Sequence, residues 1–140
     1  MFRGVIDIPS GLAVWLFTAG QNTEDDWRAY CDALGAVYRE YAGQRCPFAV
    51  QVIDPQSSDP TAKWRREIAD ASARVPKGSA IAIVSQSRIV RGVITAVSWL
   101  RPSAYTLHVV ATEREAFALA DVDRKGRGAR AAELLAQLRL

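Results

Sequence analysis

Two serines and two arginines lie close together near the middle of the chain, as Ser85, Ser87, Arg88 and Arg91. Hydroxyl and guanidinium groups are common donors to phosphate and carboxylate groups in proteins. The four residues follow an apolar run and open a predicted helix, and the N-terminus of a helix attracts anions. Their spacing predicts a contact for an anion or a phosphorylated peptide. A simpler interpretation is that Ser87 caps the helix and the arginines are solvated.

The two arginines conflict with the electrostatics of the helix that they open. Arg88 and Arg91 lie in its first turn, where the positive end of the helix dipole disfavours cations by roughly a few tenths of a kcal/mol. Sequences tend to break a local rule of this kind at functional sites. We therefore take residues 85–91 as the leading candidate for a partner-binding or anion-binding site.

A second pair of hydroxyl groups belongs to Ser57 and Ser58, in a loop between an apolar run ending at Asp54 and the dipeptide Asp59-Pro60. An aspartate followed by a proline is typical of a helix start, with the aspartate as N-cap. A phosphate near such a helix start is stabilised by the helix N-terminus. Ser57 and Ser58 are therefore candidate phosphorylation sites.

Motifs for catalysis, cofactors or metals are scarce. The sequence contains no Gly-x-Ser-x-Gly elbow, Walker loop or dinucleotide-binding glycine motif. His108, the single histidine, lies within an alternating strand pattern with no evident nucleophile beside it. Cys31 and Cys46 match no metal or redox spacing. We therefore expect no metal, no cofactor and no enzymatic activity. The alternative that stays open is a hydrolase, which would need His108 and Asp54 in one cleft.

Length and composition are those of one soluble domain. The 140 residues are 49% hydrophobic and 24% charged, a balance that is ordinary for globular proteins. No apolar run is long enough to span a bilayer. The first residues lack the basic and apolar regions of a signal peptide, so we expect a cytoplasmic protein with reduced cysteines.

Charge is distributed unevenly along the chain. Residues 1–62 contain eight acidic and four basic residues, whereas residues 63–101 contain eight basic and two acidic residues. The net charge of +3 is too small to indicate a nucleic-acid partner. The basic central segment predicts contact with an acidic partner surface, although solvated helix faces would explain it equally well.

Alternating apolar strands and amphipathic helices must position these residues. Strands are predicted at residues 2–8, 12–17, 48–53, 79–85 and 105–111. Helices are predicted at residues 24–42, 60–75, 88–101, 113–120 and 129–140. Strand–helix–strand units form parallel sheets. We therefore expect a single α/β domain with a five-stranded, mostly parallel sheet, whose first strand forms an antiparallel hairpin, in the order β-β-α-β-α-β-α-β-α plus a C-terminal helix.

The end of the chain is less strongly patterned. We assign residues 1–120 to the α/β domain and residues 121–140 to a polar linker with a C-terminal amphipathic helix. Gly126-Arg127-Gly128 lies in the linker because it does not follow a strand. The last helix has no strong cap, so the sequence leaves open whether it packs on the domain, packs on a partner or frays.

Several stretches resemble the STAS domain, the fold of the SpoIIAA anti-sigma-factor antagonists and of the looser SpoIIAA-like group related to CRAL-TRIO lipid-binding domains. The matching stretches are residues 23–26, 81–85, 91–96 and 109–116, and the likeness covers roughly residues 2–120. It implies a non-enzymatic bacterial regulatory or scaffold domain that binds a protein partner. The sequence leaves the oligomeric state open, so a second copy of the chain is a further candidate partner. The alternative that it implies is a carrier or sensor of a small lipophilic or anionic ligand, held beside the helix of Trp27 and Tyr30 or that of Trp99.

The resemblance also bears on the serine pair. In the classical antagonists, the serine that is phosphorylated lies in an Asp-Ser-Ser-Gly motif at a helix start. Here Asp54 stands at the strand end, and the loop continues as Ser57-Ser58-Asp59-Pro60. The glycine of the motif is missing, and a proline opens the predicted helix.

Overall fold

Five strands form one sheet in the computed structural model, which describes residues 1–41, 43, 47–88, 90–92, 94 and 105–140. The spatial order is β1-β2-β3-β4-β5. Strand β1 is antiparallel to β2, and the remaining neighbours are parallel. The strands are β1 (Phe2–Asp7), β2 (Leu12–Phe17), β3 (Phe48–Ile53), β4 (Ala80–Val84) and β5 (Thr106–Val110). This confirms the predicted α/β fold with its N-terminal hairpin strand.

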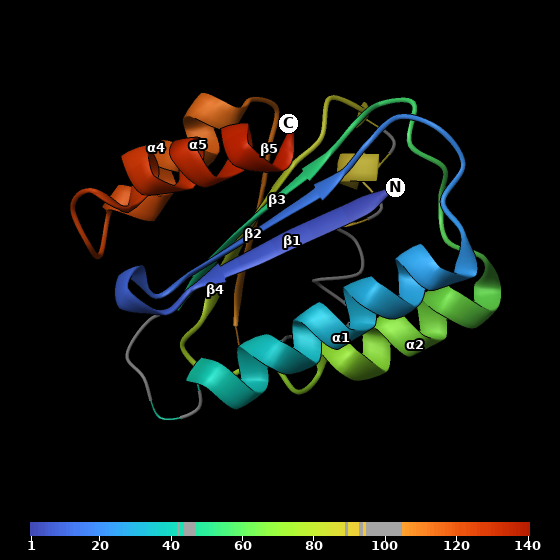
Figure 1. The fold of residues 1–140 in the computed structure, drawn as a ribbon, viewed down its shortest axis with the longest axis horizontal. Helices are drawn as coiled ribbons and strands as arrows, with labels where there is room; N and C mark the ends of the chain where they lie inside the picture. The colour runs from blue at the N-terminus through green and yellow to red at the C-terminus, as the bar shows by residue number, and fades with distance from the viewer. Residues whose placement is uncertain (42, 44–46, 89, 93, 95–104) are drawn as a thin grey trace.

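Helices cover both faces of the sheet. On one face lie α1 (Glu24–Tyr41) and α2 (Ala62–Ser72), and on the other α4 (Glu113–Asp121) and α5 (Arg127–Leu138) (Figure 1). Right-handed crossovers between strands that follow one another in order put the connecting helices on the same face. The two helices after β5 are then available to cover the opposite face. Of the helix predicted after Ser87, residues 88, 90–92 and 94 are helical, and the rest lies outside the described residues.

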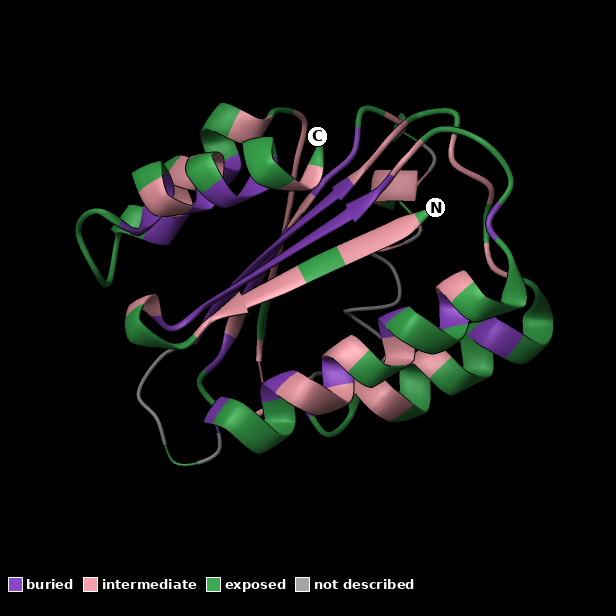
Figure 2. Cartoon of the chain, in the orientation of Figure 1, coloured by how far each residue is buried: buried purple, intermediate pink, exposed green. Residues whose placement is uncertain are grey.

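The core consists of two apolar layers, one on each face of the sheet. Every residue of β2 is buried, and Figure 2 shows β2 and β3 as the most continuously buried strands. The layer under α4 and α5 is mostly aliphatic, whereas the layer under α1 is rich in aromatic rings. The ring of Phe17 lies 5.0 Å from that of Tyr30 and 5.3 Å from that of Trp27. The helix stripe that contains Trp27 and Tyr30 is therefore part of the core.

Two helix starts have side-chain caps. The Thr23 hydroxyl accepts a hydrogen bond from the Asp26 N–H at 3.2 Å, and the Asp26 carboxylate accepts one from the Thr23 N–H at 2.8 Å. At the start of α4, the Thr112 hydroxyl accepts a hydrogen bond from the Glu115 N–H at 3.2 Å. Each arrangement satisfies amide groups that have no partner within the helix.

The predicted start of α2 is wrong by two residues. Asp59 was expected as N-cap and Pro60 as the first helical residue, but α2 begins at Ala62 with Thr61 as its N-cap. The backbone of Thr61 is extended, with φ −67° and ψ 170°. Because this conformation takes the chain out of the helical region, the Asp59 side chain does not cap the helix.

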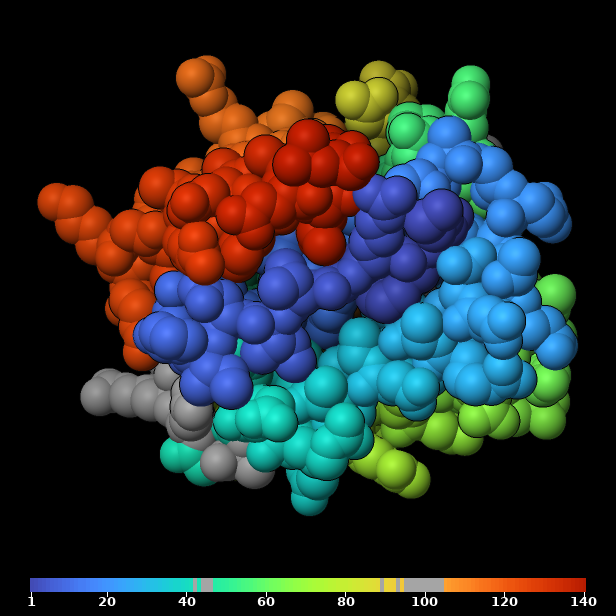
Figure 3. All heavy atoms as spheres, viewed as in Figure 1, coloured from blue at the N-terminus to red at the C-terminus, as the bar shows by residue number. Residues whose placement is uncertain are grey.

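Residues 121–140 pack on the sheet. Helix α5 lies against β2 and β1, and Figure 3 shows β1 at the surface between α5 and α1. The Asp121 carboxylate accepts hydrogen bonds from the N–H groups of Gly126 at 3.0 Å and Gly128 at 2.8 Å. Arg127 is only 3% exposed, donates to the carbonyl of Ala120 and lies over the ring of Phe48. The C-terminal helix therefore packs on the domain, which is one of the three alternatives that the sequence left open.

Candidate functional site

Strands β2, β3 and β4 are parallel, so all three end at one edge of the sheet, here called the carboxyl edge. The loops after β2 and β3 continue the parallel pairing beyond the strands, through a bridge between Gly20 and Ser57. The Gly20 N–H donates to the Gln56 carbonyl at 3.0 Å, and the Ser58 N–H donates to the Gly20 carbonyl at 3.0 Å. These loops are therefore held by backbone hydrogen bonds and form a defined surface.

Asn22 joins the two loops through three further hydrogen bonds. It is 7% exposed, and its N–H donates to the Ser58 hydroxyl at 2.8 Å. Its side-chain amide donates to the Ser57 hydroxyl at 2.9 Å and to the Ser58 carbonyl at 3.0 Å. The sequence pattern does not single out Asn22. Its role depends on a loop more than 30 residues away in the chain, which no local pattern indicates.

Both candidate phosphorylation sites are thus engaged within the fold. The Ser57 and Ser58 hydroxyl groups are half-buried and accept hydrogen bonds from Asn22. A phosphate on either oxygen would replace these contacts with Asn22, which lies two residues before the acidic first turn of α1. The phosphate would also add negative charge near those acidic residues, and like charges repel. Phosphorylation at this loop would therefore oppose the loop arrangement seen here.

The structure brings Ser85 and Ser87 together at the start of the next helix. Ser85 is 4% exposed, and its hydroxyl accepts a hydrogen bond from the Ser87 N–H at 3.3 Å. The Ser87 hydroxyl accepts a hydrogen bond from the Val90 N–H at 3.2 Å, as in an N-cap. Arg88 is exposed, and Arg91 is half-buried. Arg88 is therefore the most accessible of the four predicted site residues.

A cleft of about 400 Å³ opens at the carboxyl edge, on the face covered by α4 and α5. Its apolar lining includes Leu16, Val52 and Val84, which end β2, β3 and β4 on this face. Four charged side chains also line it, namely Arg3, Asp54, Glu113 and Arg139. Carboxyl ends of parallel strands are the usual place for ligands in open α/β sheets. The sequence placed Asp54 at this edge but gave no sign that Arg3 and Arg139 would join it.

Two of the four charges form a direct ion pair. Arg139 donates to the two carboxylate oxygens of Glu113 at 2.7 Å and 3.0 Å. The pKa of Arg139 is raised, mainly by this hydrogen bond to Glu113, with smaller help from the charge of Asp54. Arg3 instead donates to the carbonyl of Leu138 at 2.6 Å, at the end of α5, where the helix dipole favours cations.

His108 and Asp54 are not brought together. Val50, Ala82 and His108 are level across β3, β4 and β5, and Asp54 lies four residues beyond Val50. With about 3.3 Å per residue and about 4.8 Å between strands, the two residues lie roughly 13 Å apart along the sheet and roughly 10 Å across it. This separation is too great for a hydrogen-bonded pair.

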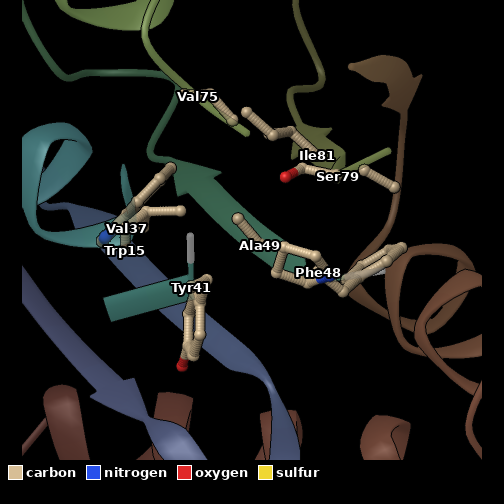
Figure 4. A pocket seen from close by; sticks show the side chains of 10 residues that line it. Trp15, Val37, Tyr41, Phe48, Ala49, Val75, Ser79 and Ile81 are labelled. Carbon is tan, nitrogen blue, oxygen red and sulfur yellow. The ribbon is translucent and has the colours of Figure 1, made fainter. Parts of the chain in front are cut away.

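The space expected for a lipophilic ligand beside Trp27 and Tyr30 is filled by aromatic rings. A hollow of about 10 Å³ remains on this face, and Figure 4 shows Val37, Tyr41 and Ser79 among the side chains around it. This volume is about that of one water molecule. Trp99, the other expected place for such a ligand, lies outside the described residues.

The remaining expectations concern metals, cysteines and membranes. Among the described residues, no three histidine, cysteine, aspartate or glutamate side chains are placed to hold a metal ion. Cys31 is half-buried, and burial raises the pKa of its thiol, whereas Cys46 lies outside the described residues. Of the helices that the structure describes, none is both long and apolar enough to cross a bilayer.

The molecule is thus an α/β domain with a charged cleft at the carboxyl edge of its sheet. Comparisons with protein families, with curated proteins and with solved structures found no match to this chain. The resemblance to the STAS and SpoIIAA-like group stays a prediction from the sequence.

Proposed function

We propose that this chain is a non-enzymatic regulatory or scaffold domain that binds a protein partner at the carboxyl edge and through its basic helices. The main support is the arrangement of the loops after β2 and β3, which Asn22 and backbone hydrogen bonds hold in one conformation. A surface ordered before binding loses less conformational entropy when a partner docks. Exposed Arg88 lies at the same edge.

The charge of α2 and its following turn supports an acidic partner. Trp64 is the one residue of α2 that is buried, so most of the helix faces solvent. Arg66, Arg74 and Lys77 are exposed, and none forms an ion pair with a described side chain. Such cations are available to an acidic surface, and they would speed its association at low salt.

Charge reversal tests this role. We expect Arg88→Glu, and separately the pair Arg66→Glu and Arg74→Glu, to abolish retention of the partner in quantitative pull-downs from the native host. The thermal unfolding midpoint should stay nearly unchanged, because these side chains are exposed. Lys125→Glu is the matched control, because it makes the same charge change at an exposed site in the α4–α5 turn. If all the variants retain the same proteins as the wild type, the proposed surface is wrong.

A second candidate function is that of a sensor for a small ligand, and the cleft of about 400 Å³ favours it. Ligand pockets in proteins commonly have volumes of this order and combine apolar walls with a few polar groups. Native mass spectrometry of the protein purified from its host tests this role. A small molecule that co-purifies with the wild type, and is lost on Val52→Trp, would support it.

A further inference from the structure

The charged residues of the cleft fall into two groups. Glu113 and Arg139 neutralise one another through two short hydrogen bonds, of 2.7 Å and 3.0 Å. Arg3 donates only to the Leu138 carbonyl and the Met1 sulfur among the described residues. The Asp54 carboxylate accepts a hydrogen bond from the Gln56 N–H at 2.8 Å. Neither Arg3 nor Asp54 forms an ion pair with a described side chain.

These two charges lie on opposite sides of an apolar floor. Arg3, Leu16, Val52 and Val84 are level across β1, β2, β3 and β4, so they form one row on the same face. Asp54 follows β3 two residues after Val52, and the alternation of side chains puts it on that face too. Arg3 and Asp54 belong to strands on either side of β2, roughly 10 Å apart. An aliphatic surface therefore separates a cation from an anion.

This arrangement selects for a ligand with both charges. A simple anion could pair with Arg3 but would be repelled by Asp54. A simple cation could pair with Asp54 but would be repelled by Arg3. A neutral apolar ligand would take water from both charges without replacing its hydrogen bonds. A carboxylate can form two parallel hydrogen bonds with a guanidinium, and an ammonium can donate to a carboxylate.

We propose that the cleft binds a small aliphatic zwitterion, with its carboxylate on Arg3, its ammonium on Asp54 and its methylene groups over Leu16, Val52 and Val84. The class includes ω-amino acids and short apolar peptides. This inference rests on the second proposed function, the binding of a small ligand, and it requires no protein partner.

A series of ω-amino acids of increasing length measures the distance between the two charges. We would titrate the protein with glycine, γ-aminobutyrate and ε-aminocaproate, and follow the methyl NMR signals of Leu16, Val52 and Val84. These signals should shift, with affinity rising as the chain length approaches the separation of Arg3 and Asp54. Caproate and hexylamine, which each carry one of the two charges, should bind at least about tenfold more weakly, the usual effect of losing one charge-assisted hydrogen bond.

Variants identify the two contacts. Arg3→Gln and Asp54→Asn should each weaken the best zwitterion at least about tenfold, whereas Arg3→Lys should restore part of the affinity because it keeps the charge. Arg65→Gln is a matched control, since Arg65 also donates to a backbone carbonyl, that of Pro60, at an exposed site. Comparable unfolding midpoints would show that α5 stays in place without the Arg3 contact.

The outcomes separate this inference from the role on which it rests. If caproate binds as tightly as ε-aminocaproate, the cleft is a site for small anions and the zwitterion assignment is wrong, while ligand binding stands. If none of the compounds shifts the three methyl signals, the assignment and the small-ligand role of this cleft are both overturned. Equal affinity in the wild type, Arg3→Gln and Asp54→Asn would also overturn the assignment.

Discussion

At the scale of single residues, Asn22 is the residue that links the two loops of the carboxyl edge. Its amide is the donor to one hydroxyl and one carbonyl of the 57–58 loop, and its backbone N–H is the donor to a second hydroxyl. A buried polar group without a partner destabilises a fold more than the average hydrogen bond stabilises it. Besides the backbone hydrogen bonds between the loops, their arrangement therefore depends on one residue that belongs to neither a strand nor a helix.

Replacing Asn22 with alanine should loosen both loops. We expect Asn22→Ala to lower the free energy of unfolding by about 1–3 kcal/mol, because the Ser57 hydroxyl and the Ser58 carbonyl lose the side-chain amide that donates to them in a half-buried place. Urea denaturation measures the loss, and hydrogen exchange at the Gly20 and Ser58 amides localises it. Gln21→Ala changes the exposed neighbour and serves as control. Equal stability of the two variants would show that the network contributes nothing measurable.

Contact between α4 and α5 is the main feature at the scale of secondary structure elements. The two helices cross so closely that a Cβ atom on Gly128 would overlap the carbonyl oxygen of Phe117 and approach the Asp121 carboxylate to 2.9 Å. The backbone of Phe117 cannot move away from this atom without displacing α4. Since α5 covers β2 and carries Arg139 at its end, this crossing also positions one wall of the cleft.

A single methyl group tests the crossing. Gly128→Ala should destabilise the protein by about 1–3 kcal/mol, the usual effect of overpacking, despite the better helix propensity of alanine. Gly35→Ala in α1 is the matched control, because only the flexible tip of Arg39 lies near its new Cβ. That variant should be neutral or more stable by up to about 1 kcal/mol. Thermal unfolding measures both variants. The packing argument would be wrong if Gly128→Ala and Gly35→Ala shifted the unfolding midpoint in the same direction.

Local patterns account for the elements better than for their contacts. The strands could be predicted because β2 and β3 are continuous apolar runs, and the helix start at Thr23 because its cap lies within four residues. The burial of Arg127 had no such signal, since a charged residue between two glycines is typical of a linker. Its partners, Gly11 and Phe48, come from distant parts of the chain.

The residues that line the cleft were also hard to predict from local sequence patterns. Asp54 could be placed at the carboxyl edge from the strand pattern alone, but Arg3 belongs to an antiparallel strand whose register brings it level with Leu16. Arg139 reaches the edge only because α5 runs back across the sheet. A site assembled from both ends of the chain is set by tertiary packing, which spacing in the sequence does not record.

Two buried phenol groups link the stability of the whole molecule to pH. Tyr30 donates to the Gln51 side chain at 2.6 Å, and Tyr41 donates to the Leu12 carbonyl at 2.6 Å. Burial raises the pKa of Tyr41 to about 12, and it raises the pKa of Tyr30 further. An unfolded tyrosine ionises near pH 10, so above that pH the folded state holds protons that the unfolded state has lost.

Stability should therefore be constant with respect to these groups below about pH 10 and should fall as the pH rises from about 10 to 12. Urea unfolding across this range measures the slope. Tyr30→Phe should be less stable at neutral pH, because Gln51 loses its donor in a buried place, yet its alkaline slope should be shallower. Tyr38→Phe, at a side chain that is 49% exposed, should keep the wild-type slope. If Tyr30→Phe and the wild type lose stability in parallel, the buried phenols do not set the alkaline limit of this fold.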